Sequence, residues 1–302
     1  GSKGGFDSIE EAFLDKSYLI HAIETGISSD PEMNWKIKNL DNISILSFSD
    51  SHSFWPWRLG RESTIFKPIT NLNYDEIINQ IRENNFIGTV ETDPAYGMYH
   101  FDGHRNCNFS SSPEKTKSLN GICPVCNNPL TIGVENRVFQ LEEKSKSSNQ
   151  FKKNYYKILP LHELISLAFG IGINSNKCWK VYDILIDKFG NEFKVLLKSN
   201  EEELFKLIND NLLVELIILN RKGLIEVLPG YDGVYGKAII CGKELGIGEE
   251  EISSSESGVF KGIEIKNKKD IFKVEKKQSE PYLPIKEIGK DSLKKSIQKK
   301  LF

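Results

Sequence analysis

The sequence lacks any run of eighteen apolar residues, so no membrane-spanning helix is expected. Its first five residues, Gly1-Ser2-Lys3-Gly4-Gly5, lack the apolar stretch of a secretory signal peptide. An excess of basic charge is also missing, because 40 Lys and Arg stand against 42 Asp and Glu, for a net charge of -2. Any contact with nucleic acid must therefore come from local groups of basic residues and not from overall charge.

Cysteine is scarce, and its arrangement indicates a metal site. The five cysteines are an odd number, and without a secretory signal they favour an intracellular metal site over a disulfide framework. His104-x-x-Cys107 is followed after fifteen residues by Cys123-x-x-Cys126. Two such pairs supply four donors for a tetrahedral structural Zn²⁺ with no open position. His100 is the alternative fourth ligand, and three unrelated buried thiols are the alternative interpretation of the cluster.

The first third of the chain alternates between two apolar patterns. Residues 20–24 and 43–48 have the content of short strands, whereas residues 6–19 and 74–84 repeat apolar positions at helical spacing. Strand and helix in alternation predict an α/β layer or barrel. Apolar positions at helical spacing return between residue 161 and about residue 228, where we expect several helices.

A polar pair follows the second predicted strand directly. Asp50-Ser51-His52 comes after residues 43–48, and functional groups in α/β proteins sit at the C-terminal ends of strands. Asp and His are ligands suited to zinc, manganese or iron. Alone, the pattern is also typical of a capping Asp beside a hydrogen-bonded His, and one pair cannot build a hydrolytic metal centre.

Several longer stretches appear in order along the chain. They are Phe6–Glu11, Glu24–Pro31, Met33–Trp35, Ser49–Ser53, Trp55–Glu62, Tyr99–Cys107, Cys123–Cys126, Leu130–Val134 and Pro229–Lys237. Together they closely resemble the endonuclease Q family, over roughly residues 6–240. That family joins a PHP-type phosphoesterase domain, a zinc domain and a helical C-terminal domain.

The resemblance implies a fold class and a division into domains. The fold is expected to be α/β: the C-terminal part of a PHP-type (β/α) barrel, a small zinc-binding domain and an α-helical C-terminal domain. We assign residues 1–90 to the PHP domain, 91–145 to the zinc-binding domain and 146–250 to a helical DNA-handling domain. Residues 251–302, Lys-rich with few aromatics, are predicted to form a flexible tail.

The resemblance also implies an activity. Members would be metal-dependent DNA repair endonucleases of prokaryotic cytoplasm and nucleoid. They would nick double-stranded DNA 5′ of a deaminated base (uracil, hypoxanthine or xanthine) or of an abasic site, after the lesion leaves the stack. Asp50 and His52 match the last metal motif of a PHP domain and would be catalytic ligands of Zn²⁺, Mn²⁺ or Mg²⁺.

Five further residues are candidates for contact with the substrate. Ser28 and Ser29, with Asn34, are placed to hydrogen-bond a flipped base, although the segment is as typical of a Ser/Asp-Pro turn. Arg58 and Arg61 could grip backbone phosphates, although Arg61 has an acidic neighbour with which it could pair.

Aromatic residues near the metal motif and at the end of the chain suggest two further contacts. Trp55 and Trp57 are candidates for stacking on bases, but a Trp-Pro-Trp run is more often packing. Gln298–Phe302 resembles the beginning of a motif that binds the sliding clamp, and a Lys-rich unstructured end is the alternative.

One departure from the family pattern leads to a specific expectation. A PHP centre also uses an early His-x-His pair, and no His-x-His occurs in this sequence. We therefore expect an N-terminally truncated member with little or no nuclease activity. Two alternatives remain: a PHP-type phosphatase for a small phosphorylated metabolite, and a non-catalytic zinc-dependent DNA-binding module.

Overall fold

The computed structural model describes residues 5–144, 151–240 and 243–245. The predicted flexible tail at 251–302, with the clamp-like segment Gln298–Phe302, lies outside the described residues. Within the described part, no helix is both long enough and apolar enough to cross a membrane.

The chain opens with a helix that is shorter than the apolar pattern predicts. Helix α1 (Ile9–Phe13) has Ser8 as its N-cap, and the Ser8 hydroxyl accepts a hydrogen bond from the Glu11 backbone N–H at 3.1 Å. Leu14 then adopts a positive φ of 49°, which ends the α-helix, and the 3₁₀ segment η1 (Leu14–Leu19) follows. The apolar pattern of residues 6–19 correctly predicted helical structure, but the structure has a short α-helix and a 3₁₀ segment in place of a single helix ending at Leu19.

Two short parallel strands come next. Strands β1 (Ala22–Glu24) and β2 (Ser44–Leu46) pair with Ile23 opposite Ile45. Between them lie α2 (Pro31–Asn34) and the 3₁₀ turn η2 (Lys38–Leu40). Parallel pairing brings both C-terminal ends to one edge, where the segments after β1 and after β2 leave the sheet.

A second sheet lies against the first. It consists of β3 (Ser63–Ile65), β4 (Gly88–Glu91) and β7 (Asn154–Lys157), with β4 antiparallel to β3 and parallel to β7. The Ser47 hydroxyl, just past β2, donates to the Val90 carbonyl at 2.9 Å and links the two sheets. Helix α3 (Tyr74–Arg82), capped by Asn73, connects β3 to β4 and lies within the helical pattern of residues 74–84.

The cysteine region is built from small elements. After the 3₁₀ turn η3 (Pro94–Tyr96), β5 (Asp102–His104) and β6 (Phe109–Ser111) form an antiparallel hairpin through η4 (Arg105–Cys107). Helices α4 (Pro113–Ser118) and α5 (Val134–Lys144) flank it. Buried Asp102 accepts a hydrogen bond from the Gly133 backbone N–H at 2.7 Å, which ties α5 to the hairpin.

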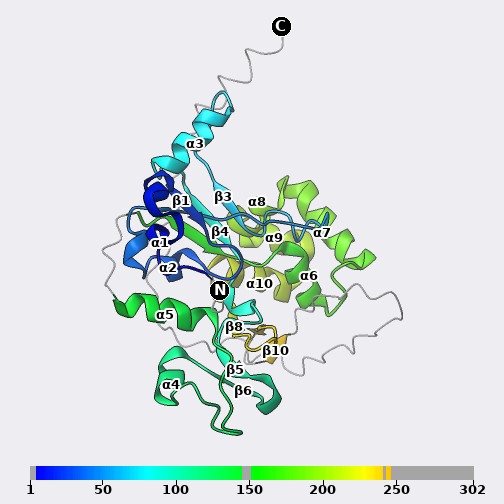
Figure 1. Cartoon of the computed structure of the whole chain (residues 1–302). Helices are drawn as coiled ribbons and strands as arrows, with labels where there is room; N and C mark the ends of the chain where they lie inside the picture. The colour runs from blue at the N-terminus through cyan, green and yellow to red at the C-terminus, as the bar shows by residue number, and fades with distance from the viewer. Residues whose placement is uncertain (1–4, 145–150, 241–242, 246–302) are drawn as a thin grey trace. The chain divides into compact units, whose positions relative to one another are not determined.

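The largest apolar core belongs to the helical region. Its helices are α6 (Leu161–Phe169), α7 (Asn176–Phe189), α8 (Glu192–Lys198), α9 (Glu201–Ile208) and α10 (Asn211–Arg221). Helix α10 packs against α6, α8 and α9, and Figure 1 shows these helices gathered in one group. Fully buried side chains such as Leu164, Leu185 and Ile217 fill the space between them.

A single side chain joins the entry and the exit of this helical region. Asn220 near the end of α10 accepts from the Leu159 backbone N–H at 2.8 Å and donates to the Leu159 carbonyl at 3.0 Å. Leu159 lies between β7 and α6, so the chain enters and leaves the helices at one place.

The chain then returns to the cysteine region. The segment Pro229–Gly236 follows β8 (Glu226–Leu228) and leads into the antiparallel strands β9 (Lys237–Ile240) and β10 (Lys243–Leu245). Gly236 donates to the Tyr96 carbonyl at 3.0 Å, and a Cβ there would overlap the Ala95 carbonyl oxygen. Close backbone contact therefore requires glycine. The whole is a mixed α/β fold of small sheets and helices, the class that the sequence predicts.

Candidate functional site

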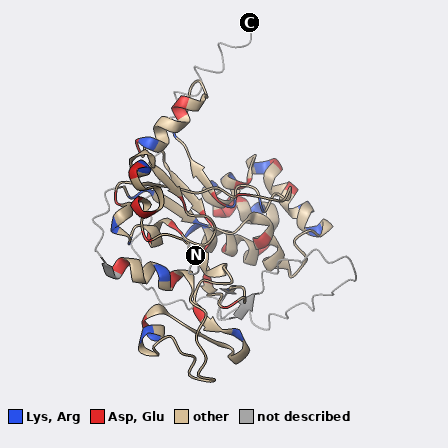
Figure 2. Cartoon of the chain, viewed as in Figure 1, with Lys and Arg blue, Asp and Glu red and all other residues tan. Residues whose placement is uncertain are grey.

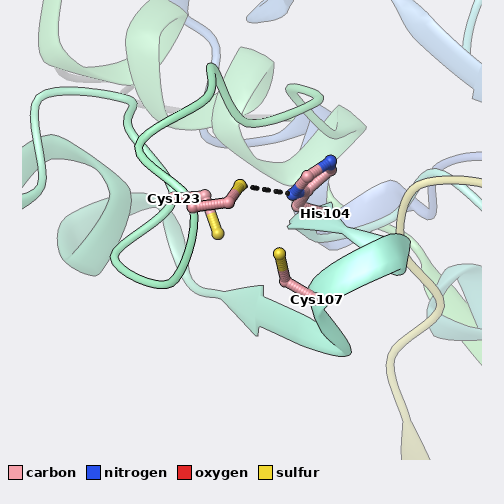
Figure 3. A group of neighbouring side chains, drawn as sticks. His104, Cys107 and Cys123 are labelled. Atoms are coloured by element: carbon pink, nitrogen blue, oxygen red, sulfur yellow. Dashed lines mark hydrogen bonds between the residues drawn. The ribbon is translucent and has the colours of Figure 1, made fainter.

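The structure gathers the four predicted ligands into one cluster. The ligand atoms of His104, Cys107, Cys123 and Cys126 all lie within 4.8 Å of one another. Figure 3 shows the first three side chains pointing toward a common centre. In the parts of the chain that are described, this is the one group of three or more His, Cys, Asp or Glu side chains close enough to share a metal ion.

Local backbone geometry forms each half of the cluster. His104 ends β5 and Cys107 ends η4, after which Asn108 adopts a left-handed φ of 47° and turns the chain into β6. In the second half, the Asn127 N–H donates to the Cys123 carbonyl at 2.9 Å. Asn tolerates the left-handed backbone conformation better than most residues. The two-residue spacing between the ligands of each pair and the Asn that follows each pair therefore both favour the turn.

The choice between the two candidate histidines is visible in their contacts. His104 Nδ1 lies 3.1 Å from Cys126 Sγ. His100 Nε2 instead lies 3.2 Å from a carboxylate oxygen of Glu135, and His100 is buried. The structure therefore places His104, and not His100, in the cluster.

The donor chemistry fits a metal ion. The hydrogen bond with Cys126, together with burial, raises the pKa of Cys107 to about 12. Against the raising effect of burial, the backbone amides of Val125 and Cys126 lower the pKa of Cys123 to about 6. Thiols this close oppose one another's ionisation, and a divalent cation bound by thiolates and imidazole removes that opposition. The cluster could thus hold a metal with four ligands and no open position.

The second predicted metal motif has a different character. Asp50 and His52 are both exposed and follow β2 at the edge where the parallel strands end. Asp50 has a positive φ of 41°, uncommon for a residue other than glycine. Among the described residues, no third His, Cys, Asp or Glu joins this pair in a possible metal group.

The serine loop after β1 is held by its own side chains. The Ser29 hydroxyl donates to the Thr25 carbonyl at 2.9 Å and accepts from Asn34 Nδ2 at 2.9 Å. Asp30 caps α2 by accepting from the Met33 N–H at 2.8 Å. Ser28 is exposed at the tip, whereas Asn34 is buried. These bonds form the Ser/Asp-Pro turn that was one of the two interpretations, and they leave Ser28 as the outward-facing candidate.

Two buried carboxyl groups that the sequence analysis did not single out join the loops at this edge. Glu62, 1% exposed, accepts from the backbone N–H of Ile27 at 3.1 Å and of Thr92 at 3.3 Å. Glu91, fully buried, accepts from the Thr25 hydroxyl at 3.0 Å. Glu62 therefore connects the loop after β1 with the loop after β4.

Burial shifts the titration of both carboxyl groups strongly. It raises the pKa of Glu62 to about 7, against the lowering effects of the Thr92 amide and of the nearby Arg61 charge. It raises the pKa of Glu91 to about 8, with the neighbouring Glu62 contributing in the same direction. Strongly shifted acids in one place are typical of functional sites, although structural networks show them too.

Comparisons by sequence give relatives for most of the chain. The family described as the MJ0043 C-terminal domain matches residues 160–223, which hold α6 to α10. Protein MJ0043 of Methanocaldococcus jannaschii is 35% identical over 236 residues, which are 77% of this chain and 29% of that protein. Protein YqxK of Bacillus subtilis is 28% identical over 239 residues, which are 78% of this chain and 56% of that protein.

Two solved structures match the fold over 77% of this chain at 28% identity. The lesion-specific endonuclease PfuEndoQ of Pyrococcus furiosus superposes with a TM-score of 0.69. Endonuclease Q in complex with a 27-mer duplex, with an abasic lesion at the active site, superposes with a TM-score of 0.64. The predicted resemblance to endonuclease Q is confirmed. The chain spans only 57% and 58% of those two structures.

In this endonuclease Q-like chain, the two candidate arginines follow the Asp50–His52 loop. Arg58 is half-buried, and its backbone N–H donates to the Trp55 carbonyl at 2.9 Å in a turn. Arg61 is also half-buried, and its charge acts on Glu62. Figure 2 shows Lys and Arg interspersed with Asp and Glu over the helices, in keeping with the net charge of -2.

The two tryptophans of this region differ in exposure. Trp57 is 5% exposed and packs against the imidazole of His162, with ring centroids 4.9 Å apart. Trp55 is half-buried and stacks on Trp57 at 4.8 Å with the ring planes 11° apart. Trp57 is thus a packing residue in this endonuclease Q-like fold.

Proposed function

We propose that this chain is the DNA-handling part of a metal-dependent repair endonuclease that nicks double-stranded DNA 5′ of a deaminated base or an abasic site. The observation that carries the proposal is the match of 77% of the chain to endonuclease Q bound to a duplex with an abasic lesion. The mixed α/β fold and the metal-compatible cluster agree with it.

The cluster of His104, Cys107, Cys123 and Cys126 would hold a structural Zn²⁺. Three thiolates and one imidazole suit tetrahedral zinc, and four protein ligands leave no position for a water or a phosphate. The small elements around it have few buried apolar side chains of their own, so a metal would stabilise them directly. The hydrolysis of the phosphodiester bond would therefore take place at another part of the protein.

Asp50 and His52 would belong to that second centre, of PHP type. Zn²⁺, Mn²⁺ or Mg²⁺ bound there would lower the pKa of a water and neutralise charge on the phosphate. The two side chains follow β2 at the sheet edge beside the serine loop, where the exposed Ser28 would hydrogen-bond the flipped base. Ser29 and Asn34 bond to each other within the loop and would contact the base by exchanging those bonds. Because no third ligand joins them within the described residues, we propose that this chain does not nick DNA by itself.

The remaining parts would bind and orient the duplex. Arg58 and Arg61 would contact phosphates near the metal pair. The helical domain, residues 146–250, would dock on the duplex, and residues 1–90 and 91–145 would supply the PHP portion and the zinc-binding domain.

A nicking assay tests the proposal. The substrates are 5′-labelled duplexes with one uracil, hypoxanthine or abasic site, with added manganese or zinc. The proteins are this chain and a chimera in which the part of the Pyrococcus furiosus endonuclease outside the match is joined to it. We expect the chimera alone to nick, on the 5′ side of the lesion, and Asp50→Asn or His52→Ala to reduce its rate by more than about 100-fold.

The assay also separates two alternatives. A folded, metal-loaded chimera that binds duplex in a salt-dependent way but leaves every strand intact would favour a non-catalytic DNA-binding module. The incomplete ligand set at Asp50 and His52 is the observation on which that alternative rests. Hydrolysis of p-nitrophenyl phosphate without nicking would favour a small-molecule phosphatase.

A further inference from the structure

The loop after Asp50 and His52 carries a column of aromatic rings. Phe54 lies on Trp55 with ring centroids 4.6 Å apart and planes 35° apart, and Trp55 stacks on Trp57 at 4.8 Å. The column continues inward through His162, whose ring is fully buried. Its outer ring, Phe54, is 79% exposed, more than any other large apolar side chain in the described part of the chain.

The inner rings of the column are anchored, so Phe54 lies on a fixed support. Beneath Trp57, the buried His162 ring packs on Tyr182 of α7 with centroids 4.0 Å apart. Around Trp55, the carbonyl accepts from the Arg58 N–H at 2.9 Å, and the backbone N–H lies 3.3 Å from the Ser53 hydroxyl. A preorganised platform loses little conformational entropy when a flat ligand stacks on it.

We propose that Phe54 stacks on a nucleobase beside the lesion, in the space that the lesion nucleotide leaves. This inference rests on the proposed function. Aromatic side chains are the usual platforms for unstacked bases, and apolar rings inserted at a base step support an opened duplex. Phe54 is two residues from His52, so its base would neighbour the phosphate held at the metal pair.

The chemistry around Phe54 favours a base over a protein or a lipid surface. The residues before it in the loop, Ser51, His52 and Ser53, are polar, and the residue after it, Trp55, is the half-buried ring on which it lies. Interfaces with proteins or membranes need a wider apolar area than one ring supplies. A single ring with a stacked support matches one base face.

The test measures equilibrium binding of the full chain to two duplexes, one intact and one with an abasic site. The variants are Phe54→Ala, Phe54→Trp and, as the control, Tyr74→Ala, which removes another aromatic ring that is 73% exposed. We expect Phe54→Ala to weaken binding to the abasic duplex by about tenfold and to leave the intact duplex within about twofold. Phe54→Trp and Tyr74→Ala should bind as the wild type does.

Cross-linking gives an independent measure of the same contact. With 5-iodouracil placed next to the abasic site, irradiation should attach the DNA to Phe54, identified by mass spectrometry of the cross-linked peptide. Equal binding of Phe54→Ala and the wild type to the abasic duplex, or cross-links that avoid Phe54, would overturn the stacking proposal alone. Failure of the wild type to bind either duplex would overturn the proposed function and this inference with it.

Discussion

Asp232 accepts a hydrogen bond from the Arg105 backbone N–H at 2.7 Å, across 127 positions of sequence. Its other carboxylate oxygen accepts from the Thr131 hydroxyl at 2.6 Å. Arg105 directly follows the candidate ligand His104, and Thr131 follows the second cysteine pair, so one carboxylate braces both halves of the cluster. The neighbouring Tyr231 hydroxyl donates to Asn108 Oδ1 at 2.9 Å and supports the same turn.

Removing this brace should loosen the metal centre without removing a ligand. We expect Asp232→Ala to release zinc to a chelator at least several-fold faster than the wild type, because outer contacts that orient ligands typically change metal affinity 10–100-fold. The measurement is stopped-flow zinc release with a chromogenic chelator. Asp187→Ala, at an exposed position of α7, is the control. Equal release rates in both variants would show that Asp232 does not support the cluster.

Replacing a cysteine of the cluster should remove the metal, whereas replacing a cysteine of the helical core should lower stability without removing the metal. We expect Cys123→Ser to lose the bound metal, measured by elemental analysis, and to increase hydrogen exchange in β5, β6 and α4. Cys178→Ala is the matched control, because Cys178 is equally buried but lies in the helical core away from the cluster. It should lower the melting temperature and keep the metal. Retention of metal by Cys123→Ser would contradict the assignment of the ligand set.

The buried carboxyl groups predict an unusual dependence of stability on pH. Burial raises the pKa of Glu62 to about 7 and that of Glu91 to about 8, so the folded protein keeps protons that the unfolded chain releases. The free energy of unfolding should therefore fall as pH rises from about 4.5 to about 8, by a few kcal/mol in total. Urea unfolding between pH 5 and pH 8 measures this.

Glu62→Gln provides the variant for that measurement. A Gln side chain keeps an acceptor for one of the two backbone N–H groups and cannot ionise. The lost second bond should lower the stability of the variant equally at every pH, and the variant should lose less stability than the wild type between pH 5 and pH 8. Glu202→Gln, at an exposed position of α9, should follow the wild-type curve. A wild-type unfolding free energy that stays constant from pH 5 to pH 8 would mean that the two carboxyl groups are ionised in the fold.

Arg58 should act on DNA affinity in a way that Phe54 does not. If its guanidinium contacts a phosphate, Arg58→Ala should weaken binding to intact and abasic duplexes alike and reduce the salt slope of log affinity by about 1. Fluorescence anisotropy over a series of salt concentrations measures both effects. Arg82→Ala, at the exposed end of α3, should leave the slope unchanged. An unchanged slope in Arg58→Ala would remove Arg58 from the phosphate-binding set.

Local features of this protein could be predicted from its sequence because nearby residues determine them. The pairs His104–Cys107 and Cys123–Cys126 have ligand spacing within single turns, and the structure brings the four side chains together. The helical pattern at residues 74–84 was predicted for the same reason, since the cap Asn73 bonds to an amide only three residues away.

Features that depend on distant segments could not be predicted in this way. Glu62 resembled a partner for Arg61, but its carboxylate bonds amides 35 and 30 positions away. The burial of Trp57 depends on His162, which comes from a helix that the sequence does not place beside it. The role of Asp232 could not be predicted from its own segment, because its partners Arg105 and Thr131 lie 127 and 101 positions away in the sequence.

The two hydrogen bonds between Asn220 and Leu159 hold the start and the end of the helical region together. Leu159, just before α6, bonds to Asn220, near the end of α10, so the segment from α6 to α10 begins and ends at the same place in the fold. An inserted segment whose two ends lie together can be lengthened, shortened or exchanged while the path of the remaining chain stays the same. The family match covers residues 160–223, with limits close to Leu159 and Asn220. Such limits are expected if this segment is inherited as a separate unit.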